Sequence, residues 1–189
     1  MSMIKNNDIQ NKMSGQRLML GFEGTELNPE LKHLIKDLGT GGLILFRGNI
    51  ETPEQISRLC MDCQAYAESS GLPPLFIAID QEGGTVVRLR EPFTIFKGNP
   101  YIEVPEDARN FANITAQELK SIGVNMNFAP VLDVVPEGLD SIMKDRAFSG
   151  PPERVSLLGT EMIRTFQENG IMAVAKHFPG IGGTVQDSH

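Results

Sequence analysis

The chain has 189 residues, with 17 Lys and Arg against 24 Asp and Glu, so its formal net charge is −7. This acidic balance offers no basic face to nucleic acid or anionic lipid, so we expect neither nucleic acid nor a membrane as a partner. The polar N-terminus predicts no secretory signal, and no apolar run reaches the ~20 residues of a membrane span. We therefore expect a cytoplasmic protein of one domain (1–189) that begins with a flexible segment at 1–16.

Short apolar runs alternate along the chain with amphipathic stretches of helical length. The apolar runs predict strands at 18–22, 42–46, 75–79, 124–132 and 171–178. The amphipathic stretches predict helices at 27–38, 53–69, 106–122 and 151–169, with an irregular loop and a short turn at 84–105. Continuous apolar strands are typical of parallel sheets buried on both faces. The sequence thus predicts an α/β fold with right-handed crossovers.

The two cysteines, Cys60 and Cys63, form a Cys-Met-Asp-Cys sequence. A redox motif of this spacing lies at a helix N-terminus after a strand, whereas this pair lies within the predicted helix 53–69. No second pair is present to complete a zinc site. We expect both cysteines to be ordinary helix residues in a reducing compartment.

Charged residues follow three of the predicted strands at their carboxyl ends. Asp80 follows the third strand, Asp133 lies at the end of the fourth, and Lys176 with His177 ends the fifth. In a parallel sheet or a (β/α) barrel, these ends line the ligand site. The alternative is that each strand merely ends at a polar residue. Their repetition at one end favours a shared site.

The segment 80–84 reads Asp-Gln-Glu-Gly-Gly and leads on to Arg88. The two glycines allow a sharp turn and a close approach of backbone to a ligand. The Asp80 carboxylate is suited to accept hydrogen bonds from paired hydroxyls, and Arg88 is suited to return to the same pocket as a donor. A simple turn with a surface ion pair is the alternative.

The three glycines at 180, 182 and 183 resemble a glycine-rich phosphate-binding loop. A dinucleotide site requires a helix to start on such glycines, but Pro179 interrupts the segment and Asp-Ser-His follows it. Nucleotide binding is therefore disfavoured. We expect no cofactor.

Asp187 precedes His189 by two residues on this glycine-rich loop. A carboxylate so placed can orient the imidazole and raise its basicity, which suits proton transfer near neutral pH. Metal binding by His177, Asp187 and His189 is the competing interpretation. Lys176 beside them would repel a cation, so we expect no metal.

Several of these segments together resemble glycoside hydrolase family 3, and the Asp-Ser-His ending resembles its bacterial β-N-acetylglucosaminidase branch. The segments are GLILFRGN (42–49), IDQEGG (79–84), VRL (87–89), NFAPVLDV (127–134), RAF (146–148), KHFPG (176–180) and DSH (187–189). They are long, ordered and spread over most of the chain, which makes the resemblance specific.

The resemblance implies an α/β fold of the (β/α)8 TIM-barrel type, of which this chain holds about the first five β/α units. It implies removal of terminal β-linked N-acetylglucosamine from muropeptides during peptidoglycan recycling. The side chains implied to hold the sugar hydroxyls are Asp80, Arg88, Arg146, Lys176 and His177. His189, held by Asp187, is implied to be the general acid/base of a retaining double displacement.

The sequence departs from the family pattern in two places. Ile181 stands where members often carry His, which removes a polar group from the loop. The family's nucleophile is an Asp in a later Ser-Asp-Asp segment, and this sequence stops at His189 before reaching it. We expect the isolated chain to be inactive. Its open sheet would expose strand edges, which favours self-association or pairing with the missing C-terminal half.

Two other functions stay open. A non-catalytic sugar-binding or assembly fragment would keep the binding residues and lack the chemistry. A β-glucosidase-type relative of the same family would take its acid from a second domain, and the Asp187-Ser188-His189 ending argues against that.

Overall fold

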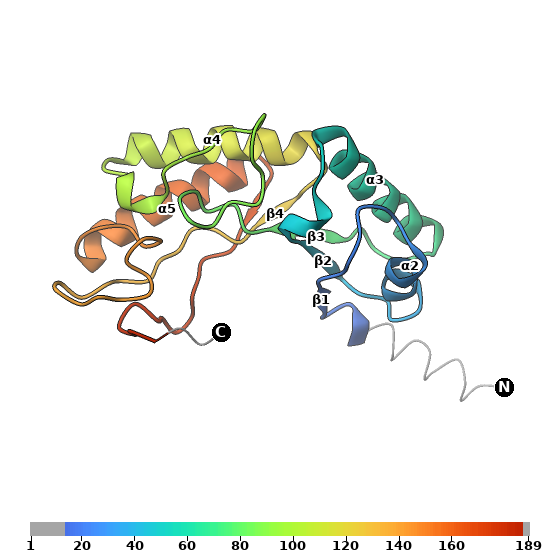
Figure 1. The fold of residues 1–189 in the computed structure, drawn as a ribbon, viewed down its shortest axis with the longest axis horizontal. Coiled ribbons are helices and arrows are strands. Elements are labelled where there is room, and N and C mark those ends of the chain that lie inside the picture. The colour runs from blue at the N-terminus through green and yellow to red at the C-terminus, as the bar shows by residue number, and fades with distance from the viewer. Residues whose placement is uncertain (1–13, 187–189) are drawn as a thin grey trace. The chain divides into compact units, whose positions relative to one another are not determined.

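The computed structural model describes residues 14–186, in which strands alternate with helices along the chain (Figure 1). The chain forms two compact units. The first holds the residues up to 79 together with 121–125, and the second holds 80–120 and the residues from 126 onward. Within the described part, every predicted strand and helix is present in the predicted order. The assignment of 1–189 to a single domain stays a prediction.

The first unit contains three parallel strands and two helices. Its elements are β1 (Met19–Leu20), α2 (Pro29–Lys36), β2 (Gly42–Leu45), the 3-10 helix η1 (Arg47–Asn49), α3 (Pro53–Ser69) and β3 (Phe76–Ile79). β2 pairs with both β1 and β3, so that Leu43 lies opposite Leu20 on one side and Ile77 on the other. Leu43 and Ile77 are each 1% exposed, as expected for strands covered on both faces.

Helix α3 begins where the sequence places a cap. The Thr52 hydroxyl accepts a hydrogen bond from the Gln55 backbone N–H at 3.1 Å, and Pro53 occupies the first helical position. Cys60 and Cys63 are free and buried within the helix. Burial raises the pKa of each thiol to about 12. Their expected position within the helix is confirmed.

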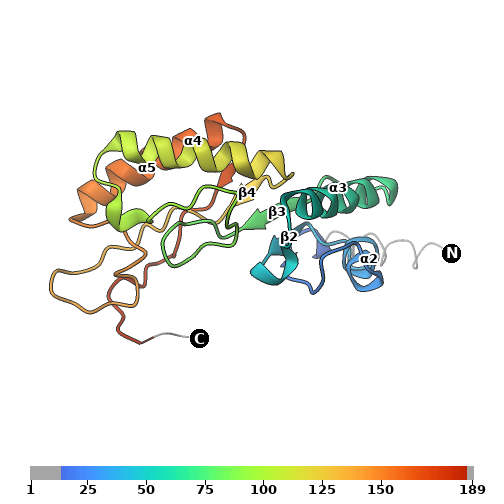
Figure 2. The same cartoon turned by 45° about the horizontal axis from the view of Figure 1, so that its top comes forward.

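The second unit contains two long helices and two short parallel strands. Its elements are the 3-10 helix η2 (Asn99–Tyr101), α4 (Pro105–Ser121), β4 (Met126–Asn127), α5 (Pro152–Glu168) and β5 (Met172–Ala173). Helices α4 and α5 lie side by side in both views (Figures 1 and 2). The rings of Phe111 and Phe166 meet edge to face, 6.1 Å apart, and Arg109 Nε donates to Glu161 Oε1 at 2.9 Å.

The last two strands are shorter than the predicted 124–132 and 171–178, because the ladder is interrupted and resumes only as an isolated bridge between Val131 and Lys176. Pro130 has no N–H to donate, which breaks the regular pairing. Its carbonyl still accepts from the Lys176 N–H at 3.1 Å, and the Leu132 N–H donates to the Lys176 carbonyl at 2.6 Å. This pairing carries Lys176 alongside the end of the preceding strand.

The N-terminal segment expected at 1–16 is described only from Ser14 onward. Gln16 is anchored there by its side-chain Nε2, which donates to the Gly39 carbonyl at 2.8 Å. Residues 1–13 lie outside the described residues. Over 14–186, no helix combines the length and apolar character that a membrane crossing requires.

Candidate functional site

The second unit gathers charged side chains from three distant segments around Lys176. Its Nζ lies 2.7 Å from Asp80 Oδ1 and 2.5 Å from Glu82 Oε1. The Glu82 side chain is 2% exposed, and those of Asp80 and Lys176 are 14% exposed. Buried charges require partners, and the ammonium group satisfies both carboxylates at once.

Arg146 is the second cation paired with Glu82. Its Nε lies 3.0 Å from Oε2 and its Nη2 lies 2.8 Å from Oε1, so the two groups form a bidentate pair. The hydrogen bonds to Glu82 raise the pKa of the Arg146 guanidinium, although burial opposes this. The buried Asn99 of η2 fixes the backbone here, because its Nδ2 donates to the Arg146 carbonyl at 3.0 Å.

Arg88 returns to Asp80, as the sequence predicts. Its Nη2 donates to Asp80 Oδ2 at 3.2 Å. The buried Gln81 holds the returning segment in place, since its Oε1 accepts from the backbone N–H groups of Arg88 and Leu89 at 3.0 Å each. The Arg88 side chain is 27% exposed and that of Asp80 is 14% exposed, so this ion pair is partly buried.

The turn between these residues depends on its glycines. Gly83 and Gly84 both have positive φ, at 83° and 62°. A Cβ on Gly84 would lie 2.8 Å from the Lys97 carbonyl oxygen, and one on Gly83 would lie 3.0 Å from Gly98 Cα. Only glycine fits this close approach of two backbone segments.

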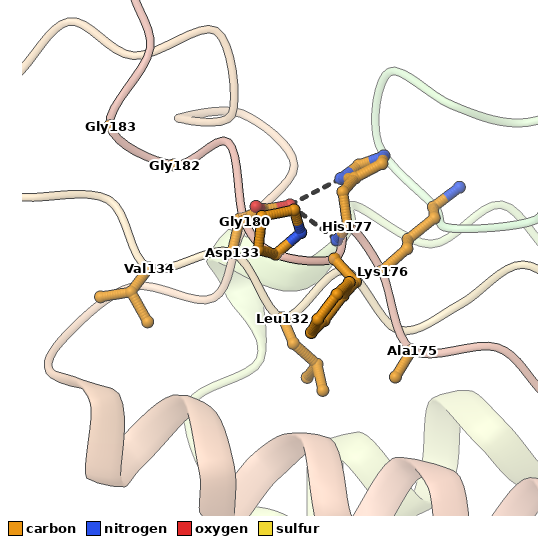
Figure 3. Close-up of a pocket in the computed structure, with 11 residues that line it drawn as sticks. Leu132, Asp133, Val134, Ala175, Lys176, His177, Gly180, Gly182 and Gly183 are labelled. Atoms are coloured by element: carbon orange, nitrogen blue, oxygen red, sulfur yellow. Dashed lines mark hydrogen bonds and ion pairs between the residues drawn. The ribbon is translucent and has the colours of Figure 1, made fainter.

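Asp133 contacts His177 and the loop that follows it. Its Oδ2 lies 2.6 Å from His177 Nδ1 and accepts from the His177 backbone N–H at 3.2 Å (Figure 3). Its Oδ1 accepts from the Ile181 N–H at 2.6 Å. Burial by itself would raise the pKa of this carboxyl, but the hydrogen bonds donated by His177 and Ile181 hold its pKa below the ordinary value.

A pocket of about 470 Å³ opens beside this carboxylate (Figure 3). Its lining residues are Leu132, Asp133, Val134, Ala175, Lys176, His177, Phe178, Pro179, Gly180, Gly182 and Gly183. Lys176 and His177 are joined by a cis peptide bond, and Phe178 is 98% exposed. The pocket therefore combines a lysine, a histidine and a buried carboxylate with an exposed aromatic ring.

The glycine-rich loop is docked against the segment after Asp133. A Cβ on Gly182 would lie 2.1 Å from the Val134 carbonyl oxygen, so no larger residue fits there. Ile181, where the family pattern often has His, packs against a buried apolar cluster of Val131, Met143 and Ala147. Its side chain thus anchors the loop by apolar contact.

The structure brings five of the seven predicted site residues into one network. His177 Nε2 lies 3.4 Å from Arg146 Nη2, which joins the histidine to the cluster around Glu82. The five residues are Asp80, Arg88, Arg146, Lys176 and His177. Asp187 and His189 lie outside the described residues. Over 14–186, no group of three or more His, Cys, Asp or Glu side chains is arranged to hold a metal ion.

Two members of the network had no role assigned from the sequence. Glu82 belongs to the Asp-Gln-Glu-Gly-Gly segment, and its position two residues after Asp80 is the one sequence feature that could indicate a role in the site. For Asp133, the sequence indicates a charge at a strand end that lines the predicted site, without a specific partner. The structure makes Glu82 the shared partner of Lys176 and Arg146, and Asp133 the partner of His177.

The model of the glycosyl hydrolase family 3 N-terminal domain matches residues 9–189. A curated relative, beta-hexosaminidase A of Pseudoalteromonas piscicida, is 39% identical over 94% of this chain and 34% of its own length. The chain spans between 34% and 53% of the length of eight curated relatives, and about half the length of most of these.

Solved structures agree with this match. The glycoside hydrolase family 3 β-N-acetylglucosaminidase of Paenibacillus sp. superimposes with a TM-score of 0.88 at 40% identity, covering 94% of this chain and 34% of that one. NagZ of Neisseria gonorrhoeae, solved with N-trifluoroacetyl-D-glucosamine, gives 0.81 at 31% identity, covering 91% and 52%. These matches confirm the expected α/β fold of the TIM-barrel type.

Proposed function

Because the chain belongs to glycosyl hydrolase family 3, we propose that it supplies the sugar-binding network of a β-N-acetylhexosaminidase. The proposed reaction is removal of a terminal β-linked N-acetylglucosamine. The observation that carries this proposal is the network of Asp80, Lys176, Glu82, Arg146 and His177, of which Lys176 and His177 line the pocket. The names of the relatives and the N-trifluoroacetyl-D-glucosamine complex of one of them support the substrate class.

The charge of the network suits a neutral polyhydroxyl ligand. Three carboxylates, from Asp80, Glu82 and Asp133, are joined by salt bridges or hydrogen bonds to the cations Arg88, Arg146 and Lys176 or to His177. No cation is left in excess to favour a phosphate. Charge-assisted hydrogen bonds to hydroxyl groups are about twice as strong as neutral ones, so such a network can bind a sugar ring tightly.

Each side chain has one proposed role in binding. Asp80 accepts hydrogen bonds from adjacent sugar hydroxyls, and Lys176 and Arg88 donate to the oxygens of the same groups. Arg146 and His177 bind a neighbouring hydroxyl group of the sugar ring. The salt bridges among these residues already hold their side chains in place, so little conformational entropy is lost when the sugar binds.

For the chemistry we assign His189, held by Asp187, as the general acid/base of a retaining double displacement. The imidazole would protonate the leaving glycosidic oxygen and then remove a proton from the attacking water. The carboxylate nucleophile on the opposite face of the sugar would come from a segment outside these 189 residues. Muropeptides as natural substrates and a cytoplasmic location are part of this proposal.

Hydrolysis of 4-nitrophenyl N-acetyl-β-D-glucosaminide by the full-length gene product tests the proposal. We expect turnover that Asp80→Asn reduces by about 10- to 100-fold, the loss of one charged hydrogen bond. Asp140→Asn, at a side chain that is 94% exposed, is the matched control and should be without effect. A folded protein without turnover would contradict the enzyme proposal and favour the non-catalytic sugar-binding fragment.

The acid/base assignment needs a separate substrate pair. His189→Ala should abolish hydrolysis of substrates with a poor leaving group, because these require a proton donor. A 2,4-dinitrophenyl glycoside, whose leaving group departs without protonation, should still release its phenol in the first step. Equal losses on both substrates would contradict the role of His189.

A further inference from the structure

The carboxylate of Asp133 is buried, and both of its oxygens are in use. Its side chain is 0% exposed. Oδ2 faces the ring Nδ1 and the backbone N–H of His177 (Figure 3). Oδ1 faces the backbone N–H of Ile181. One residue therefore contacts both the proposed sugar-binding histidine and the start of the glycine-rich loop.

These contacts decide which nitrogen of His177 carries the proton in the neutral ring. A carboxylate only accepts hydrogen bonds, so Nδ1, 2.6 Å from Asp133, is the donor. A guanidinium only donates, so Nε2, 3.4 Å from Arg146 Nη2, is an acceptor. The partners on both sides of the ring agree on the Nδ1–H tautomer.

The same carboxylate fixes the loop from the other side. The Ile181 N–H donates to Oδ1 at 2.6 Å, the Ile181 side chain packs on the cluster of Val131, Met143 and Ala147, and Gly182 lies against the Val134 carbonyl. The loop closes on itself through the Thr184 N–H, which donates to the Ile181 carbonyl at 3.1 Å. Ile181 is thus the point at which the loop is attached to Asp133.

We propose that Asp133 is a positioning residue of this site, which holds His177 as the Nδ1–H tautomer and at the same time attaches the loop that begins at Gly180. In this arrangement Nε2 carries the one free lone pair of the ring, and a ligand hydroxyl donates to it by taking the place of the 3.4 Å contact with Arg146 Nη2. The identity of that ligand rests on the proposed function, whereas the tautomer and the loop attachment do not.

An amide in place of this carboxylate cannot accept hydrogen bonds from both His177 and the Ile181 N–H. In Asp133→Asn, an amide oxygen turned toward His177 places the NH2 group against the Ile181 N–H. With the oxygen turned toward Ile181, the NH2 group faces His177 Nδ1. Nδ1 must then accept a hydrogen bond, so the ring proton moves to Nε2. There the Nε2–H donor faces a second donor, the Arg146 guanidinium. Either the loop contact or the tautomer is lost.

The imidazole 15N chemical shifts of His177 in the unmodified protein test the tautomer. Three histidines are present in this sequence, and His177→Gln assigns the resonance. In the neutral ring, we expect a protonated Nδ1 and an unprotonated Nε2. A predominant Nε2–H tautomer would overturn the proposal whether or not the protein hydrolyses glycosides.

Asp133→Asn then tests the coupling, with Asp140→Asn as the control. We expect either a shift of His177 toward Nε2–H or exchange of the Ile181 amide faster by at least about tenfold, since a buried hydrogen bond is lost. In the full-length gene product, KM for the chromogenic glycoside should rise by about tenfold or more. If tautomer, exchange and KM all stay unchanged, Asp133 positions neither group.

Discussion

Lys176 Nζ lies 2.7 Å from Asp80 Oδ1, although 96 residues separate the two in the sequence. Asp80 directly follows β3 in the sequence, and Lys176 pairs with the chain at Val131, beyond the end of β4. Glu82 lies on the other side of the same ammonium group. One lysine therefore neutralises two carboxylates that the fold places together.

Removing the Lys176 ammonium should weaken both the fold and the site. In Lys176→Gln, the 2%-exposed Glu82 keeps Arg146 but loses one charged partner. We expect the free energy of unfolding to fall by about 1–3 kcal/mol, the cost of an under-satisfied buried charge. Urea denaturation followed by circular dichroism measures it.

Lys144→Gln is the matched control for this variant. Lys144 pairs with Asp140 at 3.4 Å, and both side chains are exposed, at 65% and 94%. Exposed pairs contribute at most about 1 kcal/mol, and often nothing. Equal losses for the two lysine variants would contradict the buried character of the network.

Substitution by alanine should affect stability differently at the neighbouring residues Gly182 and Gly183. A Cβ on Gly182 would meet the Val134 carbonyl oxygen at 2.1 Å, whereas a Cβ on Gly183 would meet nothing within 4 Å. Gly182→Ala should displace the loop and destabilise the protein by about 1–3 kcal/mol through overpacking. Gly183→Ala should leave the thermal midpoint unchanged, and calorimetry of the two variants distinguishes them. Identical midpoints would show that the loop does not lie against Val134.

The lowered pKa of Asp133 makes the stability of the fold depend on pH on the acid side. Its folded-state pKa lies below the ordinary value of about 3.9, so the ionised carboxylate stabilises the folded state above about pH 4. This contribution is lost as the pH falls through the lower, folded-state pKa. The free energy of unfolding of wild type minus that of Asp133→Asn should therefore shrink below about pH 4. A difference that stays constant from pH 6 to pH 2.5 would contradict this.

The thiols of Cys60 and Cys63 should resist modification while the protein is folded. Both are buried, and burial raises the pKa of each to about 12, so the reactive thiolate is scarce at pH 8. We expect slow reaction with 5,5′-dithiobis(2-nitrobenzoate) in buffer and fast reaction of both thiols in denaturant. Rapid reaction of the folded chain would contradict the burial of this face of α3.

The order of strands and helices was predictable because hydrophobic periodicity is a local property of the sequence. The lengths of β4 and β5 were not predictable, because the extent of hydrogen bonding between two strands depends on both of them. Pro130 interrupts this hydrogen bonding although it lies within an apolar run. The meeting of Asp80, Lys176 and His177 followed from their positions after parallel strands. Parallel strands place their carboxyl ends at one edge.

Other parts of the site had no local signal. Arg146 lies in an irregular segment between β4 and α5, and only the family resemblance pointed to it. Its bidentate contact with Glu82 spans 64 residues, and no sequence pattern fixes the path of the loop between them. The Ile181 N–H reaches Asp133 through backbone conformation, which a side-chain pattern does not encode. The placement of Asp187 and His189 stays a prediction.

Titration calorimetry with N-acetyl-D-glucosamine measures whether the network around Lys176 binds a terminal N-acetylglucosamine. We expect saturable binding by the wild-type protein, weakened about 10- to 100-fold by Asp80→Asn without a change in circular dichroism. Folded wild-type protein that releases no heat, or an Asp80→Asn variant that binds the sugar equally well, would contradict it.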